Sequence, residues 1–596
     1  MLRIIYTKTL IKIMKKIYKT NIKKILLLTD SFQSLSQRIF VELVEAGYDV
    51  SVEFDINPET TKEAITLFEP DLVIAPYLKS KIPEEVFNKV LCWIVHPGIK
   101  GDRGPSSLDY AILNEEKIWG TTIIEASEEW DAGEIWSSYE FPTRFVKKSS
   151  LYRQEITEAA IRAIFEGLEK LQNKIPPIPL DYSNPEIKGK WNPYLKQQQR
   201  KINWKEDTTK TILKKIYSSD SFPGVLEQIE DKEIYLFNAF EEKTLHNEFR
   251  KKNPGDWLAK RDHAFLRKTI DGCLWIHTMK LKQDKPTFKL PASYILPEIA
   301  ENLPEIPIGY SKMENTFQEV YYTLEESIGY LYFNFYNGAM SSEQCEKLLK
   351  AYKELKTKKI NVIVLMGGED FFSNGIHLNI IENSESPALE SWQNILKMDE
   401  LCEEIIRDTD HLTISIFRGN AGAGGCYLAL TCDFVFARKG IILNPHYKSI
   451  GNLYGSEFWT YSLPKRVNQS MIKRIMDSRL PLSTKTAKDL GFIDDEIEGD
   501  IQNFDKIVRN HIKKFLKSID WKQFLYKKKM IREQDEHQKP LIDYQNEELK
   551  NLKKNFFGFD PSYHIARYYF VYKIRNFRTP LYLAKHRRIK ELVESS

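Results

Sequence analysis

The chain has 596 residues, too many for a single hydrophobic core, so we expect several domains. Hydrophobic residues make up 42% of the chain and charged residues 29%, which excludes extended disorder, and the formal net charge of +4 gives no reason to expect a nucleic-acid partner. No apolar run approaches the roughly 20 residues that span a bilayer, and the six cysteines form no CxxC pair. We therefore expect a cytoplasmic protein with reduced thiols, no membrane segment and no metal site.

The first part of the chain alternates short apolar runs with helical patterns. Residues 1–22 are basic and apolar but lack the apolar core and cleavage site of a signal peptide, so we expect an N-terminal extension. Residues 23–190, here called the front domain, predict a mostly parallel, doubly wound sheet. Its strands are expected at 24–28, 49–53, 71–75 and 91–95, and its helices at 33–46, 58–68 and 149–173.

Three further regions follow the front domain. Residues 191–305, the small domain, combine a helix with β-like pieces and end in a proline-rich linker. Residues 306–500, the rear domain, show a second α/β pattern, and residues 501–596, the C-terminal region, are helical and basic. In the rear domain, strands are expected at 328–333, 360–367 and 413–417, and helices at 341–355 and 389–408.

His96 and Asp131 are the candidate catalytic residues of the front domain. Each follows a strand of the same predicted sheet, so both can reach one edge of it. A carboxylate beside an imidazole raises its basicity and fixes its orientation, which suits proton transfer while a carbonyl carbon changes carrier. The alternative is a capping histidine and a turn-forming aspartate before Gly133.

Two stretches of the chain resemble the N10-formyltetrahydrofolate-dependent formyltransferases. Residues 96–136 read HPGIKGDRGPSSLDYAILNEEKIWGTTIIEASEEWDAGEIW, and residues 199–225 resemble the C-terminal barrel subdomain of that family. The resemblance implies a Rossmann-like parallel sheet with a small β-barrel-like, OB-type subdomain, N10-formyltetrahydrofolate as substrate, and functional roles for His96, Arg103 and Asp131. Ile94 stands where the family has an asparagine, and losing such a donor to the formyl oxygen typically costs about 100-fold or more in rate. Either another donor replaces it, or the formyl acceptor is not the usual amine.

Gln37 and Arg153 are candidates to line the same site. Gln37 opens the helix after the first strand, and Arg153 lies in the first turns of a helix leaving the same sheet. Solvated surface positions are the alternative for both.

The rear domain carries two glycine-containing loops, FSNG at 372–375 and GNAGAGG at 419–425. Two backbone N–H groups aimed at one point make an oxyanion hole, and glycines let the backbone approach a carbonyl closely. Tight turns or phosphate cradles are the alternatives for such glycine clusters.

These loops resemble those of the crotonase (enoyl-CoA hydratase/isomerase) superfamily. The resemblance covers about 317–500 and implies a crotonase-fold α/β spiral domain, coenzyme A as ligand, and Asn374 and Gly424 as the oxyanion-hole donors. At the two positions where hydratases have catalytic glutamates, this chain has Tyr427 and Tyr447. Because a phenol with a pKa near 10 is a poor base, simple hydration is disfavoured.

Glu457 follows Tyr447 in the same loop-rich segment and could supply the missing acid–base group. Its alternative is a helix N-terminal turn, where carboxylates are favoured. Tyr447 and Glu457 are therefore the catalytic candidates of the rear domain, and Tyr427 a substrate-binding candidate.

A formyltransferase-like part fused to a crotonase-like part resembles the HypX (HoxX) proteins of NiFe-hydrogenase maturation. The resemblance implies a bifunctional enzyme that makes carbon monoxide for the hydrogenase metal site. The front domain would move a formyl group to coenzyme A, the rear domain would release CO from formyl-CoA, and the hydrogenase maturation machinery would be the partner.

Two other functions stay open at this point. The front domain could formylate an amine of a tRNA or a sugar while the rear domain binds acyl-CoA, or the protein could be a non-catalytic scaffold. The basic stretch 567–588 could close over a site or contact CoA phosphates, although such charge runs are usually solvated.

Overall fold

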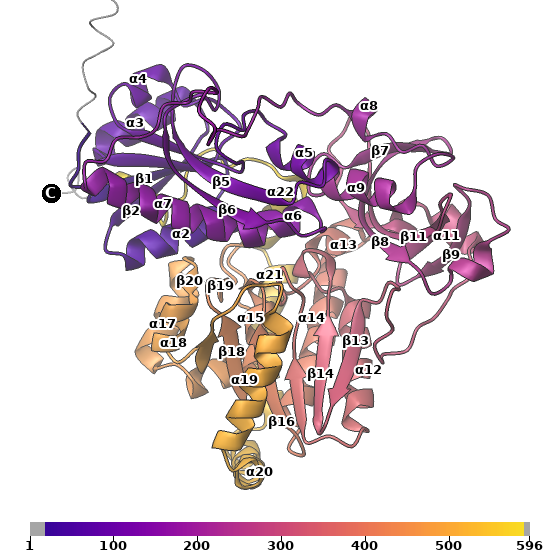
Figure 1. Cartoon of the computed structure of the whole chain (residues 1–596). Helices are drawn as coiled ribbons and strands as arrows, with labels where there is room; N and C mark the ends of the chain where they lie inside the picture. The colour runs from indigo at the N-terminus through magenta and orange to yellow at the C-terminus, as the bar shows by residue number, and fades with distance from the viewer. Residues whose placement is uncertain (1–17, 589–596) are drawn as a thin grey trace, which may run out of the picture.

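A computed structural model describes residues 18–588 of the chain. The front domain lies above the rear domain in Figure 1, the small domain lies to one side, and the chain returns at its end to the strands β1 and β2 of the front domain. Most of the predicted extension, residues 1–17, lies outside the described residues. Within the remainder, Tyr18 packs its ring edge-on against Trp136, with 4.9 Å between the ring centroids.

The front domain is built on a six-stranded sheet in the order β2-β1-β3-β4-β5-β6. Its strands are β1 (Lys24–Thr29), β2 (Asp49–Phe54), β3 (Leu72–Tyr77), β4 (Cys92–His96), β5 (Ile118–Glu125) and β6 (Ile135–Pro142). The first four strands in this order pair in parallel, as predicted, whereas β5 and β6 are antiparallel. Its helices are α2 (Ser34–Glu45), α3 (Pro58–Phe68), α4 (Glu84–Phe87), α5 (Ser107–Leu113), α6 (Lys148–Leu151) and α7 (Thr157–Gln172).

The strand β1 is apolar from Ile25 to Leu28 because helices cover both faces of the sheet. Ile25 and Leu27 pack with α2 and α7, while Leu26 and Leu28 pack with α3 and α4. The predicted helix 149–173 is interrupted by a π-helical turn, η1 (Tyr152–Ile156), between α6 and α7. Such turns are frequent at functional sites, and this one carries Arg153.

The small domain is an antiparallel sheet in the order β7-β8-β11-β10-β9, with β12 paired to β11. The strands are β7 (Val225–Ile229), β8 (Lys232–Glu242), β9 (Trp257–Arg261), β10 (Ala264–Lys268), β11 (Cys273–Leu281) and β12 (Leu290–Pro291). The helices are α8 (Gln197–Arg200), α9 (Thr209–Ser219), η2 (His246–Phe249), α10 (Ala292–Ile295) and α11 (Pro297–Asn302).

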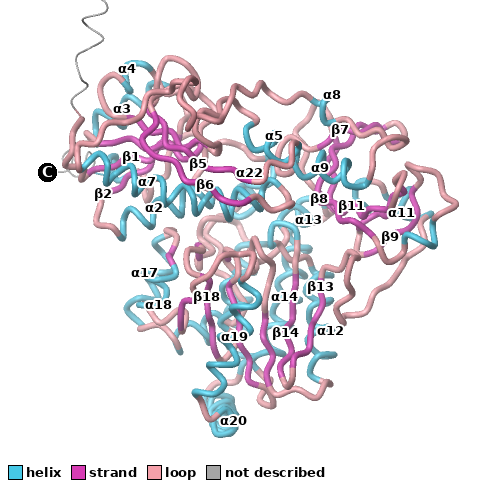
Figure 2. The backbone as a smooth tube through the Cα atoms, in the orientation of Figure 1, coloured by secondary structure: helices cyan, strands magenta, loops and turns pink. Residues whose placement is uncertain are grey.

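The rear domain has a six-stranded sheet in the order β13-β14-β15-β16-β18-β21 and a smaller sheet, β17-β19-β20. The strands are β13 (Val320–Glu325), β14 (Ile328–Phe333), β15 (Val362–Leu365), β16 (Leu412–Phe417), β17 (Ala421–Gly422), β18 (Phe434–Arg438), β19 (Ile442–Asn444), β20 (Leu482–Ser483) and β21 (Asp495–Ile497). The helices are η3 (Tyr336–Gly338), α12 (Ser342–Lys356), α13 (Leu378–Asn383), α14 (Pro387–Ile406), α15 (Gly424–Leu430), α16 (Trp459–Ser462), η4 (Leu463–Lys465), α17 (Gln469–Ser478) and α18 (Thr484–Asp489). Figure 2 shows loops gathered where this domain meets the front domain.

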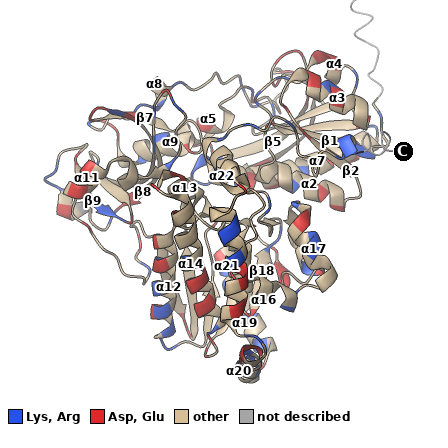
Figure 3. Cartoon of the chain, turned by 180° about the vertical axis from the view of Figure 1, so that it is seen from behind, with Lys and Arg blue, Asp and Glu red and all other residues tan. Residues whose placement is uncertain are grey.

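The C-terminal region adds helices to the rear domain and then a segment to the front domain. Its helices are α19 (Phe504–Ser518), α20 (Trp521–Gln538), α21 (Leu541–Phe557) and α22 (Ser562–Tyr572). Apolar residues of α21 and α22, among them Leu552 and Tyr563, belong to the main core of the rear domain. Figure 3 shows basic and acidic residues side by side on the helices that cover this domain.

The tail after α22 lies on β2, the edge strand of the front sheet. The N–H of Val52 donates to the carbonyl of Leu583 at 3.1 Å, and the buried Glu53 accepts from His586 at 2.8 Å and from Arg587 at 3.0 Å. The tail residues from Thr579 to Arg587 therefore cover the edge of the front sheet, whereas residues 573–578 are exposed.

Within residues 18–588, no helix combines the length and the apolar character that a bilayer crossing requires. All six cysteines are buried.

Candidate functional site

The front site lies where β4 ends. His96 is the last residue of β4, and only 4% of its surface is exposed. Its Nε2 lies 2.8 Å from Oδ2 of Asp102, and its Nδ1 lies 3.7 Å from Oδ1 of Asp131. The structure thus brings together the predicted pair, His96 and Asp131, and adds a second carboxylate that the sequence analysis did not include.

Asp102 reaches His96 because the loop after β4 turns back on itself. A Cβ on Gly98 would collide with the side chains of both His96 and Asp102, so only glycine permits this turn. From the small domain, Nδ2 of Asn192 donates to Oδ1 of Asp102 at 2.7 Å and fixes the carboxylate. The glycines at 98 and 101, close after a candidate catalytic histidine, are the sequence signal that could have pointed to Asp102.

The two carboxylates govern the protonation of His96. Burial lowers the pKa of His96, but the hydrogen bond to Asp102 and the charges of Asp131 and Asp102 outweigh it and raise the pKa above its ordinary value. Nε2 is committed to Asp102, and Nδ1 is too far from Asp131 for a hydrogen bond. Nδ1 is therefore the ring atom that can exchange a proton with a ligand.

Arg103 supports the loop that carries Asp131. Its guanidinium donates to the carbonyl of Trp130 at 2.8 and 3.0 Å, and the N–H of Gly104 donates to Oδ2 of Asp131 at 3.1 Å. Asp131 has a left-handed backbone, with φ at 51°. In this structure the predicted substrate-binding residue Arg103 therefore positions Asp131.

Gln37 and Arg153 both face the rear domain. Oε1 of Gln37 accepts from Nδ2 of Asn444 at 3.0 Å, and the guanidinium of Arg153 lies over the ring of Phe371, with 4.7 Å to the centroid. These two predicted ligand-lining residues are thus at the junction of the two domains, and neither is a solvated surface position.

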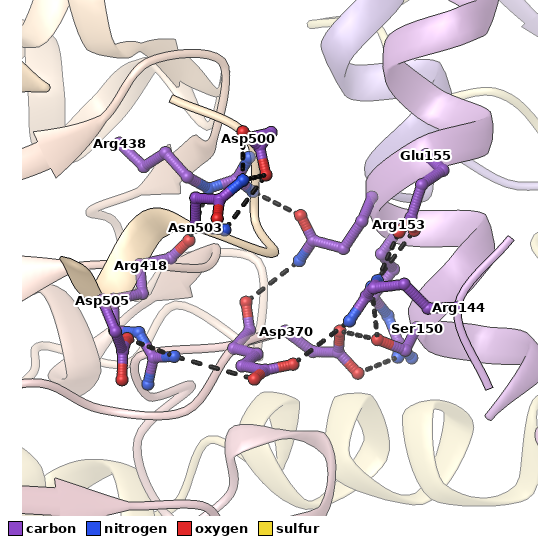
Figure 4. Close-up of polar contacts among 12 residues, drawn as sticks. Arg144, Ser150, Arg153, Glu155, Asp370, Arg418, Arg438, Asp500, Asn503 and Asp505 are labelled. Atoms are coloured by element: carbon purple, nitrogen blue, oxygen red, sulfur yellow. Dashed lines mark hydrogen bonds and ion pairs between the residues drawn. The ribbon is translucent and has the colours of Figure 1, made fainter. Parts of the chain in front are cut away.

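Polar contacts hold this junction together (Figure 4). Asp370 of the rear domain accepts from Ser150 at 2.8 Å and lies 3.5 Å from Arg153, and Nε2 of Gln154 donates to the carbonyl of Glu369 at 3.0 Å. The loop after β15 therefore rests directly on α6 and η1 of the front domain.

A polar pocket opens at the same junction. It is lined by residues of all three domains: Lys147, Ser149, Arg153, Asn238, Asn334, Phe335, Tyr336, Asn337, Asp370 and Phe371. Two cations and several amide groups give it the donors that a phosphate ligand requires.

The rear site contains the predicted pair, Tyr447 and Glu457, in direct contact. The hydroxyl of Tyr447 donates to Oε2 of Glu457 and lies 3.0 Å from the carbonyl oxygen of Ser456, and the two side chains are nearly fully buried. Burial and the nearby charge of Asp399 raise the pKa of Glu457 to about 8, against the smaller opposite effects of its hydrogen bonds. The Glu457 carboxyl therefore titrates in the range where a general acid–base group works well.

Glu457 lies beside the predicted oxyanion-hole residue Gly424. A Cβ on Gly424 would collide with the Glu457 carboxyl, so a glycine is required there. Among the described residues no acceptor is found for the Gly424 N–H, which leaves it available to a ligand oxygen. Glu457 and Phe458 have left-handed backbones, with φ at 62° and 56°, a strain of about 1–3 kcal/mol each.

Asn374 does not present the second donor in this structure. Its N–H donates to the carbonyl of Gly338 at 2.7 Å, and its side chain donates to the carbonyl of Asn337. The turn at Asn337 and Gly338, both with positive φ, brings that carbonyl to the position that a ligand oxygen would take. In this structure the Gly338 carbonyl therefore takes the place at the Asn374 N–H that the sequence analysis gave to a thioester oxygen.

Tyr427 is fully buried beneath Tyr447. The two rings stack with 5.3 Å between centroids and 13° between planes, and the Tyr427 hydroxyl donates to the carbonyl of Pro445 at 2.5 Å. Tyr427 therefore supports Tyr447 from behind, and its role in substrate binding stays a prediction.

Comparisons with known proteins assign both parts of the chain. Residues 194–288 match the family model for the formyl transferase C-terminal domain, and residues 324–557 match that for enoyl-CoA hydratase/isomerase. Over 168 residues the chain is 28% identical to methionyl-tRNA formyltransferase from Bacillus cytotoxicus, a match that covers 28% of this chain and 52% of that protein.

Two relatives match nearly the whole chain. Hydrogenase maturation factor HoxX from Bradyrhizobium diazoefficiens is 43% identical over 95% of this chain and 97% of its own length. The crystal structure of HypX from Aquifex aeolicus in complex with tetrahydrofolic acid is 48% identical, covers 96% of this chain and 100% of that chain, and superimposes with a TM-score of 0.91. The chain therefore belongs to the HoxX/HypX family of hydrogenase maturation factors.

Proposed function

We propose that the protein makes carbon monoxide in two steps. In the first step, the thiol of coenzyme A takes the formyl group from N10-formyltetrahydrofolate, which forms the C–S bond of formyl-CoA, breaks the C–N10 bond and moves the thiol proton to N10. In the second step, the formyl C–H and C–S bonds of formyl-CoA break, the proton goes to the thiolate, and CO and coenzyme A leave. Neither step needs an oxidant or a reductant.

The front site has the groups that the first step requires. The raised pKa of His96 favours its protonated form, in which Nδ1 can donate to the formyl oxygen or to the departing N10. This positive donor would substitute for the asparagine that Ile94 replaces. Tetrahydrofolic acid is bound in the Aquifex HypX structure, which supports folate as the carrier here.

The rear site has the groups that the second step requires. The Gly424 N–H would hold the thioester oxygen, and the Glu457 carboxylate would take the formyl proton and return it to the thiolate. A carboxyl with a pKa of about 8 is nearly matched to a thiol with an ordinary pKa near 8.5, so the return of the proton costs little. Tyr447 would orient the carboxyl through its hydroxyl.

The observation that carries the proposal is the contact between Gln37 and Asn444. Gln37 follows the carboxyl end of β1, at the same sheet edge where His96 ends β4. The carbonyl of Asn444 accepts from the N–H of Ala423, the residue directly before Gly424. This pair thus links the sheet edge that carries His96 to the segment directly before Gly424. The pocket with Lys147 and Arg153 lies at the same junction and would bind the CoA phosphates.

The test supplies purified protein with N10-formyltetrahydrofolate and coenzyme A and measures CO with a haem reporter. We expect CO from the wild type, no CO from either His96→Ala or Glu457→Gln, and restored CO from His96→Ala when formyl-CoA is added directly. Wild-type protein that binds both substrates and releases no CO would refute the proposal.

A further inference from the structure

Two carboxyl side chains lie fully buried behind Glu457. Asp399 comes from α14, and Glu548 comes from α21 of the C-terminal region. The sequence analysis assigned no role to either, and the proposed chemistry does not use them. Both lie in the protein core against the segment Ser456–Thr460, which carries Glu457.

Each carboxylate accepts hydrogen bonds from backbone N–H groups of that segment. Asp399 accepts from the N–H of Glu457 at 2.9 Å and from the Ser456 hydroxyl at 2.8 Å. Glu548 accepts from the N–H of Phe458 at 3.0 Å and from the N–H of Thr460 at 2.8 Å. Three N–H groups that this irregular segment would otherwise leave unpaired are therefore bound by two side chains from outside it.

These contacts fall on the strained part of the segment. Glu457 and Phe458 are consecutive residues with left-handed backbones, a conformation that persists only where surrounding groups impose it. The N–H of each strained residue is one of those held by Asp399 or Glu548. This conformation is the one in which the Glu457 carboxyl meets the Tyr447 hydroxyl and lies beside Gly424.

The cluster contains no cation. The titratable groups that face Asp399, Glu457 and Glu548 are other acidic or neutral side chains: Tyr427, Tyr447, Cys345, Cys402 and Glu403. Within residues 18–588 none of the three carboxyls forms an ion pair with a lysine, arginine or histidine. Burial raises the pKa of Asp399 to about 6 and that of Glu548 well above its ordinary value, while hydrogen bonds oppose the shift.

We propose that Asp399 and Glu548 are positioning residues for Glu457. They fix the strained segment so that the Glu457 carboxyl faces Tyr447 and Gly424, and the buried negative charge of Asp399 makes Glu457 a stronger base than a solvated carboxylate. This inference rests on the proposed function of the rear site, and it makes α21 of the C-terminal region a part of that site.

The first test is the charge-removing variant Asp399→Asn, with Glu400→Gln as a matched control on the same helix. Wild-type CO release from added formyl-CoA should rise with pH to a plateau above about pH 8. Asp399→Asn should move this inflection at least one pH unit lower and reduce the plateau at least tenfold, because the base is weaker. Glu400 pairs with Lys397 at the surface, so its variant should match the wild type.

The second test is Glu548→Gln, with the neighbouring exposed Glu547→Gln as control. The new amide NH2 meets a backbone N–H donor, so the segment loses an acceptor and kcat for CO release should fall at least tenfold with little change in KM. Formyl transfer by the front site should be unchanged in both variants, which shows that they are folded. An unchanged inflection in Asp399→Asn, or an unchanged kcat in Glu548→Gln, would overturn the inference while leaving CO synthesis intact.

An infrared titration covers the case in which the wild type makes no CO. The carbonyl stretch of the protonated Glu457 carboxyl, identified by its loss in Glu457→Gln, should titrate at lower pH in Asp399→Asn than in the wild type. An unchanged midpoint overturns the inference whatever the activity, whereas a lowered midpoint in a protein without CO release refutes only the proposed function.

Discussion

Replacing Asp102 with asparagine should lower the pKa of His96 and so favour its neutral form. At an effective dielectric constant of 20, a unit charge 2.8 Å from the imidazolium contributes about 6 kcal/mol, and one at 3.7 Å about 4.5 kcal/mol, before desolvation. Asp102 thus supplies more than half of the attraction that holds the proton on the buried His96. Without it, the opposing effect of burial should prevail and the pKa of His96 should fall by more than one pH unit.

The asparagine also changes which ring nitrogen carries the proton. Oδ1 of residue 102 is held by Asn192, so the new amide NH2 faces Nε2 of His96 and makes Nε2 an acceptor. We expect formyl transfer at neutral pH to fall about 100-fold, and the basic limb of its pH–rate profile to move to lower pH.

Formyl transfer is measured as tetrahydrofolate released in the presence of coenzyme A. Asp181→Asn, in an exposed turn of the same domain, is the matched control and should behave as the wild type. CO release from added formyl-CoA should be unaffected by Asp102→Asn, which separates a local change from unfolding. A variant that keeps both the wild-type rate and the wild-type basic limb would refute the role assigned to Asp102.

Three further predictions concern the rear site, the junction and the tail. Tyr447→Phe removes the hydroxyl that orients Glu457, so CO release from formyl-CoA should fall about 10- to 100-fold, whereas tetrahydrofolate release by the front site should not change. Arg153→Ala removes a cation from the junction pocket and should raise the KM for coenzyme A about tenfold, since a charged hydrogen bond is worth about 1.5–3 kcal/mol; an unchanged KM would exclude this pocket as the phosphate seat. Glu53→Gln breaks a buried ion pair and should lower the free energy of unfolding in urea by about 3 kcal/mol, compared with less than about 1 kcal/mol for the exposed pair removed by Asp49→Asn.

The strand pattern of both domains was predictable because their parallel strands are covered on both faces. Residues 25–28 and 362–366 are apolar at every position, which identifies a buried strand without any alternation. His96 and Asp131 lie close together for a different reason than the sequence analysis assumed. Because β5 runs antiparallel to β4, Asp131 follows the end of β5 that lies beside Trp93, and its loop folds back toward His96.

The residues that the sequence analysis missed have no such periodic signal. Asp399 and Glu548 lie on amphipathic helices that are far apart in the chain, where a carboxylate normally marks the solvated face. Their burial depends on how α21 packs against the rear domain, and this packing cannot be predicted from the sequence around either residue. The partner of the Asn374 N–H was not predictable for a similar reason, because the Gly338 carbonyl that accepts from it comes from another loop.

The contact of the tail with β2 has a consequence for biosynthesis. Glu53 leaves the ribosome early, but the histidine and arginine that form hydrogen bonds with it follow more than 500 residues later. Until then the nascent front domain carries an uncompensated carboxylate and an open strand edge, the kind of surface on which chaperones act. A chain that terminates before Thr579 would therefore lack the segment that covers β2. The front domain, although translated first, would be left without its last contacts.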